Sequence, residues 1–328
     1  MGMERAGVTF ASLMSLGPET ALSTARLAAE VGYDSYWTAE TTGPEAFSLL
    51  AAVGAAAPAL GLGTAVLALQ LRTPMVVAMA GATLQALHPE RDIVLGVGIS
   101  SPVVATRWHG ASYSDRPLAH TREYVTLLRQ CLTGEKVDFD GDFYTVKGFR
   151  LGVRLGDRRP KIVIGALNPK MLQLAGELAD GVALNYLPAS HVAWSVEQVR
   201  KGGPAEIYAY VHAGVCEREE GLDLARRDLF SYAVVDSYAR NFERAGFADE
   251  VAEIRSRHAE GDRAGALAGV SDRMVDAIDV MGDPHTVQAT MRAYVEAGVD
   301  VPVLMPLPWG ADRRASADLA IRAAMGRA

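Results

Sequence analysis

Residues 161–185, KIVIGALNPKMLQLAGELADGVALN, hold one complete strand–helix–strand unit. The apolar run Lys161–Ala166 has the composition of a strand, and Asn168-Pro169 then opens a helix. Proline suits the first helical position because the N–H that it lacks would have no partner there. The helix ends at Ala179-Asp180-Gly181, where glycine accepts the left-handed backbone that closes a helix. A second apolar run follows, so the unit predicts two parallel strands joined by a helix.

The same signals for helix starts and ends recur along the chain. Proline opens helices at Gly17-Pro18, Gly43-Pro44, Thr73-Pro74, Leu187-Pro188 and Asp283-Pro284. Strand-like runs occupy Gly7–Leu13, Tyr33–Ala39, Leu60–Leu67, Asp92–Val97, Lys161–Ala166, Val182–Asn185, Glu206–Cys216 and Val301–Met305. Eight strands, each followed by a helix, predict an α/β fold of the (β/α)8 TIM-barrel type rather than an open sheet. We expect one domain over residues 1–328, with the charged, strandless stretch of about 222–280 as a helical insertion before the last βα unit.

Composition narrows the class of protein. The chain has 328 residues, of which 49% are hydrophobic. Its net charge is −7, and its Lys and Arg residues form no basic stripe, which argues against a nucleic-acid partner. Cys131 and Cys216 lie far apart without metal-ligand spacing, as expected of buried thiols in a reducing compartment. The apolar stretch Ala51–Leu69 is broken by proline and glycine, so we expect no membrane span and a cytoplasmic protein.

In a barrel of this type the active site lies at the carboxyl ends of the strands. The residues expected there are Ser12, Glu40, Thr41, Thr42, Ala65, Val66, Gly96–Ser100, Gly165–Asn168, Asn185 and Tyr186. They include no cluster of carboxylates, so a divalent-metal barrel is disfavoured and no metal ligands are assigned. They include no Cys or Lys nucleophile either. A mouth of small, apolar and neutral polar residues suits a flat, partly apolar cofactor.

Two glycine-containing motifs at this end each allow two interpretations. In Gly96-Val97-Gly98 the glycines either relieve crowding at a strand end or let a ring approach the backbone. The motif is not a Rossmann fingerprint, because the third glycine is missing. Gly165–Lys170 is either a well-capped helix start or a phosphate site, because free N–H groups point outward there.

A family resemblance rests on segments spread over nearly the whole chain. They are residues 32–40 (GYDSYWTAE), 62–66 (LGTAV) with 72–74 (RTP), 95–102 (LGVGISSP) with 108–110 (WHG), 116–119 (RPLA) with 122–124 (REY), 166–171, 175–182 (AGELADGV), 282–284 (GDP) and 297–300 (AGVD). On these segments the chain resembles the bacterial luciferase-like superfamily, in the branch of oxidoreductases that use the deazaflavin coenzyme F420 and are similar to methylenetetrahydromethanopterin reductase. That resemblance implies a barrel enzyme acting on a small molecule.

The resemblance also implies where the cofactor lies. Its ring is expected against a bulge in the third strand, with a non-prolyl cis peptide at Ala65-Val66. The ring's polar end is expected at Glu40-Thr41 and Gly98-Ile99, and the phosphate side at the turn Gly165, Ala166, Leu167 and Asn168. Candidate substrate contacts are Ser12, Trp37, Trp108, Asn185 and Tyr186, although the tryptophans suit core packing equally well.

One departure from the family concerns proton transfer. Relatives often carry a histidine after the acidic residue at the end of strand two, where this chain has Glu40-Thr41. Glu40 is therefore expected either to move protons or only to hold the ring. His109 is the other candidate, because its loop is expected to overhang the strand ends; the alternative is a loop-packing histidine.

Three functions stay open on the sequence. The first is hydride transfer with coenzyme F420, the second a monooxygenase that uses reduced FMN on the same fold, and the third a binding protein without catalysis. The helices Pro44–Ala57 and Pro74–Leu87 are apolar, with hardly a charge between Phe47 and Leu71. Outer barrel helices normally present a charged face to water. We therefore expect a homodimer through this side, as the resemblance also implies.

Overall fold

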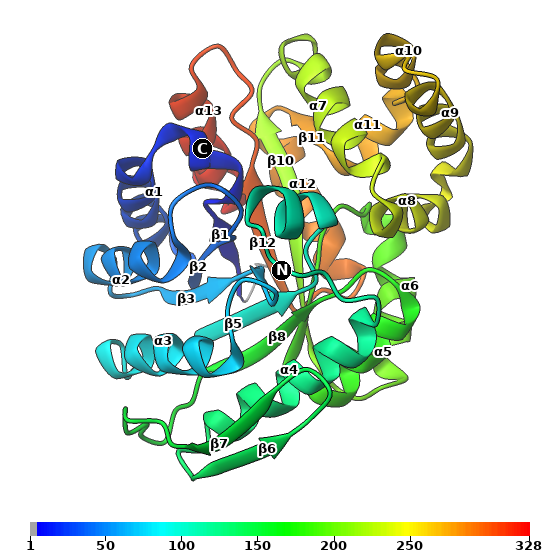
Figure 1. The fold of residues 1–328 in the computed structure, drawn as a ribbon. Coiled ribbons are helices and arrows are strands. Elements are labelled where there is room, and N and C mark those ends of the chain that lie inside the picture. The colour runs from blue at the N-terminus through cyan, green and yellow to red at the C-terminus, as the bar shows by residue number, and fades with distance from the viewer. Residues whose placement is uncertain (1–4) are drawn as a thin grey trace.

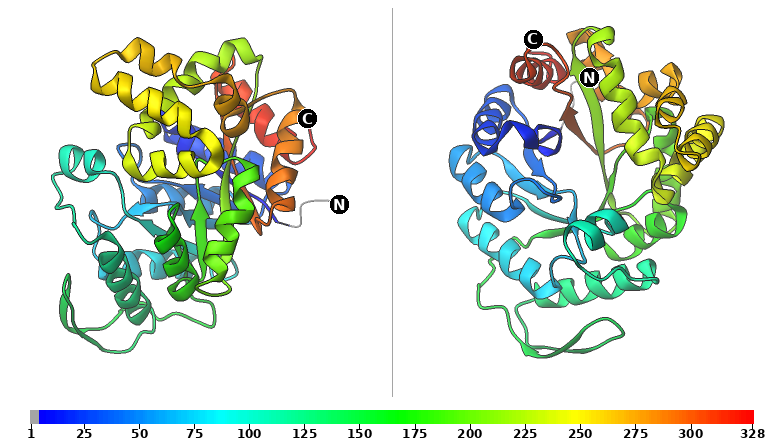
Figure 2. Two further views of the ribbon diagram at one scale, coloured as in Figure 1. Left: turned by 90° about the vertical axis from the view of Figure 1, so that its right-hand side faces the viewer. Right: turned by 45° about the horizontal axis from the view of Figure 1, so that its top comes forward.

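The computed structural model describes residues 5–328. Parallel strands close into a barrel inside a ring of helices (Figure 1 and, looking into the ring, the right-hand view of Figure 2), in the order β1-β2-β3-β5-β8-β9-β10-β12, with β12 pairing back to β1. The strands are β1 (Gly7–Thr9), β2 (Ser35–Thr38), β3 (Gly61–Thr64), β5 (Ile93–Gly98), β8 (Lys161–Gly165), β9 (Gly181–Leu184), β10 (Glu206–Val215) and β12 (Val301–Pro306), with short strands β4 (Leu67–Ala68) and β11 (Val280–Gly282) and the hairpin β6 (Val137–Asp140) and β7 (Thr145–Phe149). The predicted (β/α)8 barrel is confirmed.

The helices between the strands begin at the prolines that the sequence predicts as helix starts, with two exceptions. The helices are α1 (Pro18–Val31), α2 (Ala46–Ala56), α3 (Pro74–Leu87), α4 (Pro117–Cys131), α5 (Pro169–Leu178), α6 (Ala189–Arg200), α12 (Pro284–Glu296) and α13 (Arg313–Ala324), with short turns η1 (Ala11–Leu16) and η2 (Val103–Trp108). The predictions that Pro44 and Pro188 open helices are wrong. Helix α2 begins two residues after Pro44, because the Glu45 carboxylate accepts the N–H groups of Phe47 and Ser48 and caps it. No helix among residues 5–328 is long and apolar enough to cross a membrane.

The barrel has an inner and an outer apolar layer, separated by the alternation of side chains along each strand. The inner layer consists of Trp37, Val94, Val163, Ala183, Tyr208, Tyr210, Val301 and Val303. Along β10, Tyr208 and Tyr210 point inward, whereas Ile207, Ala209 and Val211 pack against the surrounding helices. The barrel interior is therefore filled with side chains, and a ligand has to bind at its end.

Residues 218–278 form a group of helices beyond the carboxyl end of β10, which we call the helical layer (Figure 1; left-hand view of Figure 2). It contains α7 (Arg218–Ala233), α8 (Asp236–Phe242), η3 (Glu243–Phe247), α9 (Ala248–Ala259), α10 (Arg263–Ala268) and α11 (Asp272–Ile278). Its buried side chains form their own apolar cluster, which Tyr186 joins from the barrel. Strand β11 then pairs with β10 at Ala213–Val215, beyond the part of β10 that pairs with β9.

Candidate functional site at the barrel mouth

The residues that follow the carboxyl ends of the strands form one surface, which we call the mouth. The bulge between β3 and β4 lies in it and contains the cis peptide Ala65-Val66, as predicted. The bulge is anchored to β2, because Ala65 N–H donates to the Thr38 carbonyl at 2.8 Å. The Val66 side chain packs so closely on its neighbours that a Cβ on Gly165 would lie 2.7 Å from it, and one on Gly98 would lie 3.0 Å from it. The glycines at the ends of β5 and β8 therefore make room for the bulge.

The first glycine of Gly96-Val97-Gly98 has a packing role. The Gly96 N–H donates to Thr64 Oγ1 at 2.9 Å, and that hydroxyl donates to the Gly96 carbonyl at 3.0 Å. A Cβ on Gly96 would lie 1.9 Å from the Thr64 carbonyl oxygen. Of the two interpretations of this motif, the relief of crowding holds for Gly96.

Glu40 lies at the mouth in a charged network that the sequence did not indicate. The Arg72 guanidinium donates to both Glu40 carboxylate oxygens, at 2.8 and 2.7 Å, and also contacts Glu45. Glu40 Oε1 in addition accepts the Ala46 N–H at 3.3 Å. Hydrogen bonding to Glu40, opposed by burial, raises the pKa of Arg72. The Glu40 side chain is 13% exposed, and both of its oxygens serve as acceptors in this arrangement.

The loop after β5 reaches across to the end of β2. The His109 Nε2–H donates to the Thr41 carbonyl at 2.6 Å, which ties this loop to the mouth and leaves Nδ1 as the unprotonated nitrogen of a neutral ring. Trp108, beside it, is 56% exposed. His109 and Trp108 are thus within the region where we expected them, and the turn η2 lies across the ring in the right-hand view of Figure 2.

Two predicted substrate contacts differ in burial: Trp37 lies inside the barrel, and Ser12 is half-buried at the end of β12. Trp37 is 1% exposed and lies in the inner apolar layer, with its indole N–H donating to Ser35 Oγ at 2.8 Å. It is a core residue, and the period of two along β2 gives the reason, since alternate residues of a barrel strand point inward. The Ser12 hydroxyl donates to the Pro306 carbonyl at 2.5 Å and joins the start of η1 to the end of β12.

The turn between β8 and α5 is the predicted phosphate site, and it has a neighbour from far along the chain. Asn168 stands at the N-cap position, but its side chain makes no capping hydrogen bond. Its Oδ1 instead accepts from Arg244 at 2.5 Å, and its Nδ2 donates to the Ser237 carbonyl at 3.3 Å. Arg244 also reaches the Leu167 carbonyl at 3.4 Å, lies 5.4 Å from the centre of the Trp194 ring, and keeps a buried Nε without a partner. Burial lowers the pKa of Arg244.

Arg244 belongs to the helical layer and was not among the predicted site residues. The residue is 76 positions from Asn168, and no local pattern connects the two. The Arg244 side chain places a guanidinium at the amino end of α5, where the backbone N–H groups already favour an anion. Gly165, Ala166 and Leu167 remain at this turn, with Ala166 N–H bonded to the Ala183 carbonyl at 3.2 Å.

Asn185 and Tyr186 belong to a polar cluster in which Tyr186 is buried and Asn185 is half-buried. Asn185 Oδ1 accepts from the Tyr186 backbone N–H at 2.9 Å and contacts His212 Nε2 at 2.8 Å. Tyr186 is 2% exposed and packs against Tyr232, with the two rings tilted by 32° and their centres 3.8 Å apart. His212, which the sequence analysis passed over, could have been found by the inward alternation that it shares with Tyr208 and Tyr210.

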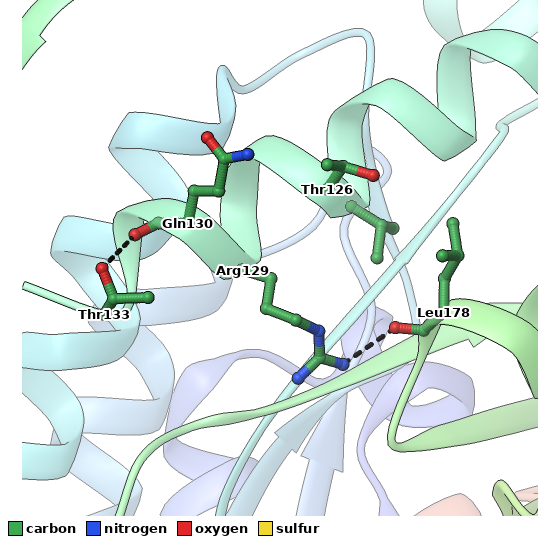
Figure 3. A pocket seen from close by; sticks show the side chains of 6 residues that line it. Thr126, Arg129, Gln130, Thr133 and Leu178 are labelled. Carbon is green, nitrogen blue, oxygen red and sulfur yellow. Dashed lines mark hydrogen bonds between the residues drawn. The ribbon is translucent and has the colours of Figure 1, made fainter. Parts of the chain in front are cut away.

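A hollow of about 240 Å³ lies on the outside of the barrel, between the end of α4 and the end of α5 (Figure 3). Its lining residues are Val125, Thr126, Arg129, Gln130, Thr133 and Leu178. Arg129 donates to the Leu178 carbonyl at 2.9 Å and to Asp180 at 3.2 Å. Because the barrel helices run opposite to the strands, these helix ends lie at the face away from the mouth, where residues serve stability.

Comparison with known proteins identifies the family. The sequence profile of the luciferase-like monooxygenase family matches residues 7–301. The 5,10-methylenetetrahydromethanopterin reductase of Archaeoglobus fulgidus is 28% identical over 308 residues, covering 90% of this chain and 91% of the relative. The F420-dependent glucose-6-phosphate dehydrogenase of Mycobacterium tuberculosis is 38% identical over 143 residues, 42% of either chain.

A solved structure with low sequence identity to this chain has the same fold. The coenzyme F420-dependent tetrahydromethanopterin reductase of Methanopyrus kandleri superposes with a TM-score of 0.78 at 20% identity, covering 97% of each chain. This likeness extends over the barrel and the helical layer alike. With the profile match over residues 7–301, it follows that the chain belongs to the luciferase-like monooxygenase family.

Proposed function

We propose that the protein is an oxidoreductase that transfers a hydride between coenzyme F420 and a small organic substrate at the mouth. The observation that carries the proposal is the bulge at Ala65–Val66, packed on Gly98 and Gly165 in the position where the family resemblance puts the cofactor ring. Relatives named as F420-dependent enzymes support the choice of coenzyme. The deazaflavin, when bound, supplies or accepts the hydride, and the protein orients it and excludes water.

The residues at the β8–α5 turn fit the anionic side of such a coenzyme. The amino end of α5 and the Arg244 guanidinium face the same turn, and the buried Arg244 Nε has no partner among the described residues. A buried N–H without an acceptor is costly. A phosphate oxygen at this turn would supply the missing acceptor for that Nε. The phosphate would lie beside the backbone of Ala166 and Leu167, where the family resemblance puts it. Asn168 would then orient Arg244 rather than contact the phosphate alone.

At the other end of the ring, we propose that Glu40 has a positioning role. Arg72 engages both carboxylate oxygens, so Glu40 holds the end of β2 and the start of α2 in place beside Thr41. Both of its oxygens are already occupied as acceptors in these contacts. His109 uses only Nε2 in its contact with Thr41. Its other ring nitrogen is therefore the better candidate for proton transfer, and Ile99 and Trp108 would border the same space.

The two candidates are separated by substitution. Glu40→Gln should lower kcat by less than about tenfold and weaken cofactor binding, because it removes a positioning ion pair. His109→Ala should cause the larger fall in kcat, toward the 10²–10⁴-fold range of general acid–base catalysis. Steady-state kinetics and cofactor titration of both variants make the comparison, with Glu45→Gln, which also loses an Arg72 contact, as the control. A collapse of kcat in Glu40→Gln with intact binding would instead make Glu40 the proton donor.

The family description favours one alternative, a monooxygenase that uses reduced FMN. Equilibrium titration of the purified protein with coenzyme F420 and with FMN distinguishes the two. Tight binding of F420, weak binding of FMN and turnover with F420 would support our proposal. The reverse preference, with oxygen consumption, would favour the monooxygenase. Cofactor binding without turnover over a broad panel of small substrates would favour a binding protein.

We further propose a homodimer through helices α2 and α3. Neither helix carries a charged residue. On α3, Val76, Met79 and Leu87 are 45%, 52% and 60% exposed, which is unusual for the outside of a barrel. Light scattering at micromolar concentration should give twice the chain mass of 34.9 kDa.

A charge placed in this face should break the dimer. Met79→Lys should give a monomer, because burying an unpaired ammonium group at the interface is unfavourable. Leu224→Lys is the matched control, since Leu224 is an exposed apolar residue on α7 in the helical layer. A monomeric wild-type protein, or a dimer that Met79→Lys leaves intact, would contradict the assignment.

A further inference from the structure

A histidine and two aspartates from three separate elements meet between the barrel and the helical layer. His212 comes from β10, Asp228 from α7, and Asp279 from the junction of α11 and β11. One ligand atom of each lies within 4.8 Å of the other two. Nitrogen and oxygen ligands bind Zn²⁺ at about 2.0–2.2 Å, which requires ligand atoms within roughly 4.4 Å of one another. The three ligand atoms are therefore grouped at nearly the spacing that a shared cation requires.

The hydrogen bonds around His212 leave one ring nitrogen available. Asn185 Oδ1 is identified as the oxygen because the Tyr186 N–H also donates to it at 2.9 Å. His212 Nε2, 2.8 Å away, must then be the protonated nitrogen and donate. In the neutral ring the Nδ1 lone pair faces Asp279 Oδ1 at 2.9 Å. Two acceptors at this distance need either a proton or a cation between them.

Among residues 5–328, no lysine or arginine side chain pairs with this cluster. His212 and Asp279 are 1% and 0% exposed at the side chain. Asp279 Oδ2 is buried and has no hydrogen-bond partner. Buried carboxylates are costly unless they are paired or coordinate a metal. A divalent cation with two aspartates and a neutral histidine would make the group electrically neutral.

We propose that His212, Asp228 and Asp279 bind a divalent first-row transition cation, with Zn²⁺ as the best fit to one imidazole and two carboxylates. Nδ1 of His212 and one oxygen of each aspartate are the ligands. Outer contacts of the kind that orient metal ligands are in place. Asn185 accepts from the other nitrogen of His212, and the Tyr186 hydroxyl donates to Asp228 Oδ2 at 2.9 Å.

The cation would have a structural role, because its ligands join β10 to α7 and to the end of α11. It would hold the helical layer, and Arg244 with it, against the barrel mouth. This site is independent of the proposed hydride transfer, and it runs against the sequence-based expectation of a protein without a metal. No local sequence pattern indicates this site, because the three ligands stand at positions 212, 228 and 279.

The test is metal binding by the full chain, with no activity readout. The titrations are done at pH 8, because protons compete less with a metal for carboxylate and imidazole ligands at higher pH. Protein dialysed against a chelator is titrated with Zn²⁺ by calorimetry and with Co²⁺ by visible absorption. We expect one equivalent per chain and a higher melting temperature with Zn²⁺. Asp228→Asn should weaken binding at least tenfold.

Asp223→Asn is the matched control, because Asp223 is an exposed aspartate on the same helix, and it should bind as the wild type does. Circular dichroism checks that each variant is folded; Asp228→Asn keeps an oxygen for the Tyr186 hydroxyl. If the wild-type chain takes up no stoichiometric Zn²⁺ or Co²⁺ at pH 8, the proposal is overturned, since His212 and Asp279 then share a proton. Equal affinity in wild type and Asp228→Asn would overturn it as well.

Discussion

Gly96→Ala should destabilise the protein by more than about 3 kcal/mol, at the upper end of what overpacking costs in a well-packed interior. The added Cβ would lie 1.9 Å from the Thr64 carbonyl oxygen. This neighbour is backbone, so no side-chain rotation can relieve the contact. Either β3 or β5 has to move, and the Thr64–Gly96 hydrogen bonds are lost with that movement. Urea unfolding followed by circular dichroism measures the difference.

The matched control for Gly96→Ala is Gly152→Ala. A Cβ on Gly152 would meet nothing within 4 Å, and its backbone is not in the left-handed region. Its stability should stay the same or rise slightly, because alanine restricts the unfolded chain. The displaced Thr64 also precedes the bulge at Ala65–Val66, so any folded Gly96→Ala protein should bind the cofactor weakly. A Gly96→Ala variant as stable as Gly152→Ala would refute the packing argument.

Arg244→Met should weaken the binding of coenzyme F420 by about 10- to 150-fold, the equivalent of the 1.5–3 kcal/mol typical of a hydrogen bond to a charged group. Methionine keeps the apolar contact with Trp194 and removes the guanidinium that faces Asn168 and Leu167. Fluorescence titration of the coenzyme measures the change. A deazaflavin without the phosphate-linked tail should bind wild type and Arg244→Met equally.

Two controls make the Arg244 result specific. Arg255→Met removes an exposed arginine of the helical layer that pairs with Asp236 at 2.7 Å, and it should not change coenzyme affinity. Asn168→Asp would put a carboxylate against Arg244, so it should weaken binding by competing with the phosphate for that cation. Unchanged F420 affinity in Arg244→Met would mean that the anionic side of the coenzyme binds elsewhere.

The mouth shows which site features a sequence can reveal. The cis peptide at Ala65-Val66 was predicted from a family motif, because the bulge is encoded in the consecutive residues Gly63–Val66 and their place at a strand end. The pairing of Glu40 with Arg72 was not predicted, because the two stand 32 positions apart and adjacent strands bring them together. Glu40 therefore looked like a free acid in sequence and is an ion-pair partner in the structure.

The sequence by itself determined the barrel, because its signals are local: proline at helix starts, glycine at helix ends, and apolar runs between them. Tertiary structure alone decided the side-chain roles. Arg244 meets Asn168 across 76 positions, and His212 meets Asp279 across 67. Pairings between elements depend on how the helical layer packs on the barrel, and no short-range pattern records that packing. The same packing covers Tyr186, which lies in the apolar cluster of the helical layer.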